Sequence, residues 1–132
     1  MENAQHLISR LLVTEDDPVL KRFYLQALKP ICEKLKVVDS STEAIALLKS
    51  QSFDFLITDL KLSEKDGLDI ISCALDNCPD IIILVASGYV NDSKYHDELI
   101  RIKNVKGYLQ KPFTMDVLHQ KIKTILLNHD NS

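Results

Sequence analysis

The chain has 132 residues, a length that suits one compact domain built around one core. Hydrophobic residues make up 45% of it, charged residues 27%, and the formal net charge is −3, which disfavours non-specific binding to nucleic acids. No apolar run approaches the roughly 18 residues of a membrane-spanning helix. Residues Met1 to Arg10 lack the apolar stretch of a signal peptide, so we expect a cytoplasmic protein.

Three cysteines, Cys32, Cys73 and Cys78, occur without a CxxC spacing. We interpret them as small apolar residues in a reducing compartment. A structural zinc site would need further His or Cys partners at the spacing of a zinc finger, and the sequence has none.

Five short apolar runs follow one another along the chain. In order they are Leu11–Val13, Leu35–Val38, Phe53–Thr58, Ile81–Ala86 and Gly107–Leu109. The second and the fifth are weak on their own, whereas the other three are well defined. Runs that are apolar on both faces are typical of strands in a parallel sheet that is covered on both sides.

A segment with helical spacing follows each run. Asp17 and Pro18 can cap and begin the first helix, and Ser40 with Glu43 has the spacing of a capping box at the start of the second. Apolar residues mark the faces of the first three helices at Leu20, Phe23, Ala27 and Leu28, at Ile45, Leu47 and Leu48, and at Leu68, Ile71 and Leu75 before Pro79. The fourth helix is marked by Tyr95, Leu99 and Ile102, and the fifth, which starts near Thr114, by Met115, Leu118, Ile122 and Ile125.

This fivefold alternation of strand and helix favours an α/β fold with a parallel sheet. Five strands are too few for an eight-stranded barrel, so an open, doubly wound, five-stranded parallel sheet remains. In such a sheet the ligand site lies at the carboxyl ends of the strands, where the strand order reverses.

Polar residues stand at four of these carboxyl ends. Glu15-Asp16-Asp17 follows the first strand, Asp59 the third, Ser87-Gly88 the fourth and Lys111-Pro112 the fifth. Each alone is typical of a cap or a turn, but together they would place carboxylates, a hydroxyl and an ammonium group at one edge of the sheet. Clustered carboxylates repel one another unless a cation relieves them, and Mg²⁺ prefers oxygen ligands. The set therefore predicts a phosphoryl-transfer centre with an aspartate nucleophile.

The segments LLVTEDDP, DLKLSEKDG, IIILVASGY and GYLQKPF occur in this order between about Arg10 and Leu127. Together they resemble the receiver domain of bacterial two-component response regulators. The resemblance implies a single receiver domain over residues 1–132 with short polar ends, and a flavodoxin-like (βα)5 sheet of strand order 2-1-3-4-5. It also implies a signalling domain that phosphorylates and dephosphorylates itself, without an outside substrate, and not a metabolic enzyme.

The same resemblance implies what Asp59 and its acidic neighbours do. Asp59 would accept a phosphoryl group from a sensor histidine kinase or a histidine phosphotransfer protein, in a phosphorelay that depends on Mg²⁺. Asp16 would ligate the Mg²⁺ directly and Glu15 through water. Asp59 and the backbone carbonyl of Lys61 would complete the protein's share of the ligands.

The remaining roles implied by the resemblance fall on the last two strands. Lys111, in a cis peptide bond with Pro112, would pair with Asp59 or its phosphoryl oxygens. Ser87 would hydrogen-bond the phosphoryl group, and Tyr108 would turn inward as the switch when Ser87 moves. Members of this family can also form a homodimer through the fourth helix, fifth strand and fifth helix. We interpret the charged residues of that face, such as Arg101 and Lys121, as solvated surface in the first instance.

Several positions depart from the usual family pattern. Glu15 replaces the commoner Asp, Ser63 stands in place of a Pro, and residues 91–104 lack the usual Ala-Gly ending of the fourth helix. Lys61 and Tyr89, two positions after Asp59 and Ser87, flank the route of the hydrolytic water in the family. Because both side chains are long or bulky, the hypothesis is that the phosphorylated form hydrolyses slowly.

Three alternatives stay open at this point. The domain could stand alone or form part of a larger regulator or hybrid kinase, and the polar residues Asn128–Ser132 fit a short tail as well as a linker. A flavin-binding flavodoxin-like protein would need a hydroxyl- and glycine-rich loop where Glu15-Asp16-Asp17 would instead repel a phosphate. A phosphatase with an aspartyl nucleophile would carry that nucleophile at the end of the first strand, with a second Asp two residues on.

Overall fold

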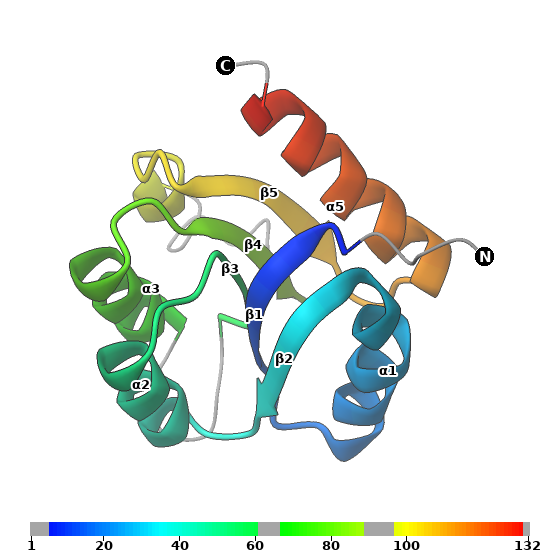
Figure 1. The fold of residues 1–132 in the computed structure, drawn as a ribbon, viewed down its shortest axis with the longest axis horizontal. Coiled ribbons are helices and arrows are strands. Elements are labelled where there is room, and N and C mark those ends of the chain that lie inside the picture. The colour runs from blue at the N-terminus through cyan, green and yellow to red at the C-terminus, as the bar shows by residue number, and fades with distance from the viewer. Residues whose placement is uncertain (1–5, 61–66, 89–96, 131–132) are drawn as a thin grey trace.

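The computed structural model describes residues 6–60, 67–88 and 97–130 of the chain. Within these residues five parallel strands form one sheet in the order β2-β1-β3-β4-β5. The strands are β1 Ile8–Thr14, β2 Cys32–Val38, β3 Phe55–Thr58, β4 Ile82–Ser87 and β5 Val105–Gln110. The helices are α1 Pro18–Leu28, α2 Ser41–Ser50, α3 Gly67–Asn77 and α5 Met115–Asp130, and a short 3₁₀ helix spans Lys29–Ile31 (Figure 1).

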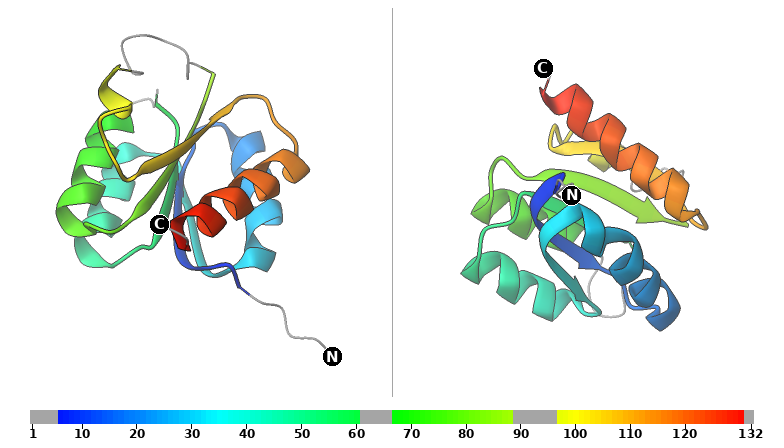
Figure 2. Two further views of the ribbon diagram at one scale, coloured as in Figure 1. Left: turned by 90° about the horizontal axis from the view of Figure 1, so that it is seen from above. Right: turned by 45° about the vertical axis from the view of Figure 1, so that its right-hand side comes forward.

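Helices cover both faces of the sheet, with α1 and α5 on one face and α2 and α3 on the other (Figures 1 and 2). Successive strand residues point to opposite faces, so neighbouring residues join different cores. Leu12 packs into the core on the α2 and α3 side, whereas Leu11 and Val13 pack into the core on the α1 and α5 side. Every residue of β3 and β4 is buried, as expected for strands between two helical layers.

The helix starts follow the capping signals in the sequence. The Asp17 carboxylate accepts a hydrogen bond from the Val19 N–H at 2.9 Å, and Pro18 occupies the first turn of α1. The Ser40 hydroxyl accepts from the Glu43 N–H at 3.1 Å at the start of α2. The acidic segment Glu15-Asp16-Asp17 therefore lies between the end of β1 and the capped start of α1, which limits its length to three residues.

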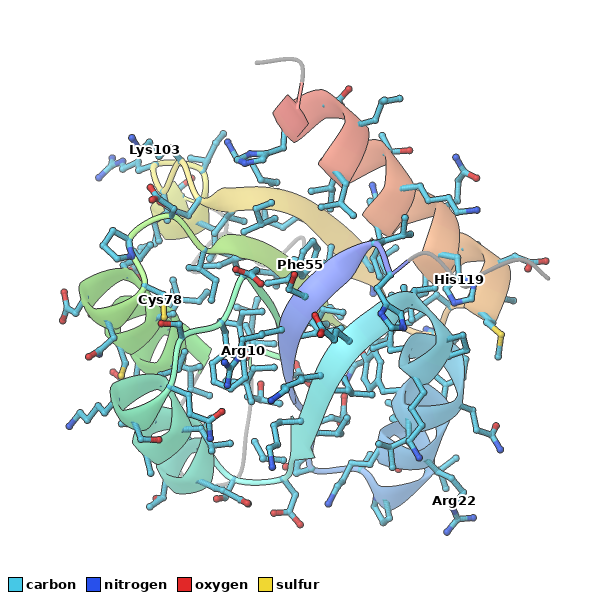
Figure 3. The ribbon with its side chains drawn as sticks, viewed as in Figure 1. Arg10, Arg22, Phe55, Cys78, Lys103 and His119 are labelled. Carbon is cyan, nitrogen blue, oxygen red and sulfur yellow. The ribbon has the colours of Figure 1, made fainter. Side chains whose placement is uncertain are left out.

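The helix α1 contacts both α5 and the loop that follows β5. Figure 3 shows His119 on the α5 side that faces α1, and its Nε2 lies 2.6 Å from the backbone oxygen of Ala27. Phe113, two residues after Lys111, packs edge-on against Phe23 with ring centroids 5.9 Å apart, and its ring also lies near that of Tyr24. The loop that carries Lys111 is therefore held against α1 by aromatic packing.

The predicted fold class and strand order are confirmed. The two weak runs are both strands and are longer than expected, because pairing with β1 and β4 recruits the charged residues around them. Of the fourth helix, residues 97–99 are helical, while Tyr95 lies outside the described residues. Within the described residues no helix is long and apolar enough to cross a membrane.

Candidate functional site

The carboxyl ends of β1, β3 and β5 bring one ammonium group between two carboxylates. Lys111 Nζ lies 2.6 Å from Glu15 Oε1 and 2.6 Å from Asp59 Oδ2. The side chain of Glu15 is 2% exposed, that of Asp59 11% and that of Lys111 16%. Charge-assisted hydrogen bonds of this length between groups that water hardly reaches are strong. Three residues that the sequence predicted as site residues are thus in direct contact.

The second oxygen of each carboxylate is also engaged. Glu15 Oε2 accepts from the Asp17 N–H at 3.1 Å, and Asp59 Oδ1 accepts from the Leu60 N–H at 2.7 Å. Both donors come from the backbone within three residues of the end of a strand. The two carboxylates are therefore oriented by the chain itself as well as by Lys111.

Burial and hydrogen bonding shift the pKa values of Glu15 and Lys111 in opposite directions. Burial raises the pKa of Glu15 above its ordinary value of 4.5, and the hydrogen bonds from Lys111 and from the Asp17 backbone offset this only in part. Burial by itself would lower the pKa of Lys111, but its hydrogen bonds with Asp59 and Glu15 together raise that pKa above 10.5. Lys111 is therefore charged over the whole physiological pH range.

Ser87 and Tyr108 lie on the two strands next to this group. Ser87, the last residue of β4, is fully buried, and its backbone oxygen accepts from the Lys111 N–H at 3.0 Å. The peptide bond between Lys111 and Pro112 is cis, as the family resemblance implied. Tyr108 on β5 is half-buried against the core on the α2 and α3 side, and burial raises its pKa.

The other predicted site residues are not brought into this contact. Asp16 is exposed at the surface. Lys61 and Tyr89 lie outside the described residues, so their predicted roles stay predictions. Within residues 6–60, 67–88 and 97–130 no three carboxylate, imidazole or thiol groups lie close enough together to hold a metal ion. The magnesium site therefore also stays a prediction from this geometry.

Gly67 has a steric reason to be glycine. A Cβ added there would lie 2.1 Å from the backbone oxygen of Asp59 and 3.0 Å from the Cα of Leu60. Its N–H donates to the Leu60 oxygen at 2.7 Å. The start of α3 is therefore packed directly onto the backbone of the predicted nucleophile, with no room for a side chain.

Two site neighbours were missed by reading the sequence, namely Thr14 and Thr58. Their hydroxyl oxygens lie 2.6 Å apart across β1 and β3, and both side chains are buried. The signal that could have found them is positional, since each threonine directly precedes a carboxylate of the site. Tyr24 is a further neighbour that the sequence does not single out. The charges of Glu15 and Asp59 add to burial in raising its pKa, so its phenol also lies in the field of this group.

One surface hollow lies at the opposite end of the strands from this group. It has a volume of about 420 Å³ and is lined near the start of β4 and β5 by residues that include Lys103, Lys106 and His129. In an open parallel sheet the chemistry is expected at the carboxyl ends, so the Glu15, Lys111 and Asp59 contact is the better candidate site.

Residues 11–123 match the family model of the response regulator receiver domain. The chain belongs to this family. Response regulator receivers are signalling domains of two-component systems. The match covers all four strand ends at which the sequence placed its polar residues.

Relatives of this receiver differ in how much of the protein the domain makes up. The response regulator receiver protein CpdR of Brucella abortus is 28% identical over 121 residues, which cover 91% of this chain and 98% of CpdR. The transcriptional regulatory protein GlrR of Escherichia coli is 30% identical over 125 residues, which cover 92% of this chain and 27% of GlrR. The region similar to this chain thus makes up nearly all of one relative and about a quarter of the other.

A solved structure supports the fold independently. The response regulator TrrA of Thermotoga maritima, crystallised in complex with Mg²⁺-BeF, has a TM-score of 0.73 to this chain at 23% identity. The likeness covers 89% of this chain and 99% of TrrA. At this identity the comparison concerns the fold alone.

Proposed function

We propose that this receiver accepts a phosphoryl group on Asp59 from a phosphohistidine and changes conformation in response. The donor would be a sensor histidine kinase or a histidine phosphotransfer protein, the classes with which receiver domains interact. The observation that carries the proposal is the position of Lys111, whose ammonium lies 2.6 Å from Asp59 at the carboxyl edge of the sheet. A carboxylate with a fixed cation beside it can act as a nucleophile towards a negatively charged phosphoryl group.

In the proposed transfer a carboxylate oxygen of Asp59 forms a bond to phosphorus while the phosphorus–nitrogen bond to the donor imidazole breaks. The electron pair of that bond returns to the imidazole, which leaves as the neutral histidine after taking up a proton. Lys111 stabilises the charge on the phosphoryl oxygens because it already faces Asp59. The Leu60 N–H, which donates to Asp59 Oδ1 at 2.7 Å, keeps the attacking carboxylate oriented.

A divalent cation would complete the charge balance of this site. Bound Mg²⁺ would neutralise negative charge on the carboxylates and the phosphoryl oxygens. Glu15, Asp16, Asp59 and the Lys61 carbonyl offer only oxygen donors, which fits the chemistry of this ion. In the described geometry Lys111 contacts both Glu15 and Asp59. To take part in metal binding, Glu15 would have to give up its contact with Lys111 and accept a hydrogen bond from a water that the metal holds.

The proposed response to phosphorylation starts at Ser87 and Tyr108. The Ser87 hydroxyl would turn towards the phosphoryl oxygens, and Tyr108 would move inward from its half-buried position. The two arrangements would be a pair of states whose populations the phosphoryl group shifts. Formation of a homodimer through the fourth helix, β5 and α5 would be one consequence of this change.

Labelling of the protein with a small acyl phosphate tests the proposal. The wild-type protein should gain one phosphoryl group in the presence of Mg²⁺ and none with a chelator, as measured by intact-protein mass spectrometry. Asp59→Asn should abolish the labelling, because an amide oxygen is a much weaker nucleophile than a carboxylate. Asp76→Asn, at an exposed position on α3, is the matched control and should label like the wild type. Labelling of Asp59→Asn at the wild-type level would move the acceptor to another residue.

A further inference from the structure

Two buried hydroxyl groups lie directly beneath the carboxylates of the site. Thr14 ends β1 and Thr58 ends β3, and the two residues are paired in the parallel register of these strands. Their side chains are 2% and 0% exposed, and their Oγ1 atoms lie 2.6 Å apart. Glu15 follows Thr14 and Asp59 follows Thr58, so each carboxylate is attached to one member of the pair.

The direction of the hydrogen bonds in this pair follows from counting protons. The Thr58 Oγ1 lies 2.9 Å from the backbone oxygen of Asp59, which can only accept. A hydroxyl has one proton to donate, so Thr58 gives its proton to Asp59 and must accept from Thr14. The hydrogen bonds therefore run in one direction, from Thr14 to Thr58 and from Thr58 to the Asp59 carbonyl.

The Asp59 carbonyl is the point at which several constraints meet. Thr58 donates to it, and the Cα of Gly67 packs so closely that an added Cβ would lie 2.1 Å from it. The N–H of the following residue, Leu60, donates to the Asp59 carboxylate. A rotation of the peptide plane between Asp59 and Leu60 would therefore move both the carbonyl and the N–H that orients the nucleophile.

We propose that the Thr14–Thr58 hydroxyl pair is a positioning element of the site, which holds the Asp59 peptide plane and thereby the separation of the Asp59 and Glu15 carboxylates. This inference rests on the proposed function, because it assigns the pair a part in phosphoryl acceptance. The pair links the two strands whose ends carry the two carboxylates, one residue before each of them. Lys111 contacts the carboxylates, and the hydroxyl pair holds the backbone from which they project.

A purely structural role is the competing explanation, since buried hydrogen bonds also stabilise the fold. The two roles differ in what a variant changes besides stability. Thr58→Val keeps the shape of the side chain and removes the donor to the Asp59 carbonyl. The amide signal of Leu60 in an NMR spectrum would report the loss of that hydrogen bond under either explanation. If the pair positions the site, the affinity of the folded protein for Mg²⁺ should fall as well, whereas a purely structural role would leave that affinity unchanged.

Three variants and two controls separate these explanations. Thr58→Val should lower the rate of labelling by a small acyl phosphate and the affinity for Mg²⁺ by roughly fivefold each, the factor that one ordinary hydrogen bond provides. Thr14→Val should have a smaller effect, because Thr58 can still donate to Asp59, and the double variant should resemble Thr58→Val. Thr58→Ser should restore the wild-type values. Ile83→Val, fully buried on β4, should lower stability without altering Mg²⁺ affinity or the Leu60 signal.

The results can contradict the inference without touching the proposed function. If the wild type is labelled but Thr58→Val has the wild-type labelling rate and Mg²⁺ affinity, the pair does not position the site. A larger effect of Thr14→Val than of Thr58→Val would also overturn it, because the proton direction would be wrong. If the wild-type protein itself is not labelled while Asp59 is intact, the proposed function fails instead.

Discussion

Lys111 Nζ lies 2.6 Å from Asp59 Oδ2, although the two residues are 52 positions apart in the sequence. The same ammonium lies 2.6 Å from Glu15 Oε1. A single cation therefore compensates two carboxylates that would otherwise repel each other at the edge of the sheet.

Replacing this cation should destabilise the protein when no metal is present. Lys111→Met keeps most of the apolar stem but leaves Glu15 and Asp59 without a counter-charge. We expect the free energy of unfolding in urea, measured with a chelator present, to fall by about 2 kcal/mol. This is less than the roughly 3–5 kcal/mol for breaking a fully buried pair, because Lys111 keeps some contact with water. Mg²⁺ should restore part of the loss.

The control for this prediction is Lys123→Met, because Lys123 is exposed on α5. Its stability should stay close to that of the wild type, as expected for an isolated surface charge. Equal stabilities of the Lys111 and Lys123 variants would show that the ammonium contributes nothing to the metal-free fold.

The raised pKa of Lys111 predicts a loss of stability in alkaline solution. The unfolded chain releases the lysine proton near pH 10.5, whereas the folded protein holds it to a higher pH. The folded state therefore binds more protons in this interval, and stability falls as the pH rises through the folded pKa. Unfolding in urea at a series of pH values with a chelator should show this loss in the wild type. Lys111→Met, which has no ammonium group at this position, should not show it.

Glu15 acts with the same sign in a lower pH window. Its pKa is raised above 4.5, so its contribution to stability is complete below pH 4.5 and is lost as the pH rises through the folded pKa. Glu15→Gln should flatten this part of the profile. A wild-type profile that climbs through the same window more steeply than that of the variant would contradict the assigned direction.

Gly67 should tolerate no side chain. Gly67→Ala would bring the new Cβ onto the Asp59 carbonyl, so either α3 or the Asp59 peptide must move. We expect a loss of about 2 kcal/mol in the free energy of unfolding, typical of overpacking, and slower labelling of Asp59 by a small acyl phosphate.

Gly88→Ala serves as the comparison for stability, because a Cβ added at Gly88 meets no atom within 4 Å. It should unfold at nearly the same urea concentration as the wild type. If both alanine variants are equally stable, the close approach of Gly67 to Asp59 is not a constraint on the fold.

The lifetime of the phosphorylated form is a prediction from the sequence alone. Lys61 and Tyr89 are large residues at positions that flank the route of the hydrolytic water in this family. Replacing both by alanine should speed the loss of the phosphoryl group, measured by mass spectrometry after the donor has been removed and with Mg²⁺ present. An unchanged decay rate in the double variant would show that these side chains do not shield the acyl phosphate.

The sequence predicted the fold and the edge at which the site lies because both depend on local patterns. Buried parallel strands are apolar throughout, and the polar residue after each one stands out. Asp59 and Lys111 could therefore be nominated and expected to meet. That Lys111 also pairs with Glu15 and not with Asp16 depends on which side chain turns inward after β1, and a run of three acidic residues does not encode that.

The hydroxyl pair shows a second limit of sequence reading. Thr14 and Thr58 look like ordinary β-branched strand residues, and their link depends on the register of two strands that are 44 positions apart. A polar residue at the last position of two neighbouring central strands is a signal only when the strand order is known.

The order in which the site residues occur along the chain has a consequence for protein synthesis. The acidic residues Glu15 and Asp59 are translated before their counter-charge at Lys111, and the contact between Glu15 and Lys111 spans most of the domain. Domains form as units during translation, and contacts distant in sequence close last. A nascent chain in which β1 to β4 have been translated, but β5 has not, thus carries the two carboxylates without the lysine that compensates them. Competence to receive a phosphoryl group would then arise only in a molecule whose sheet has been closed by β5, so phosphorylation would report that the domain is complete.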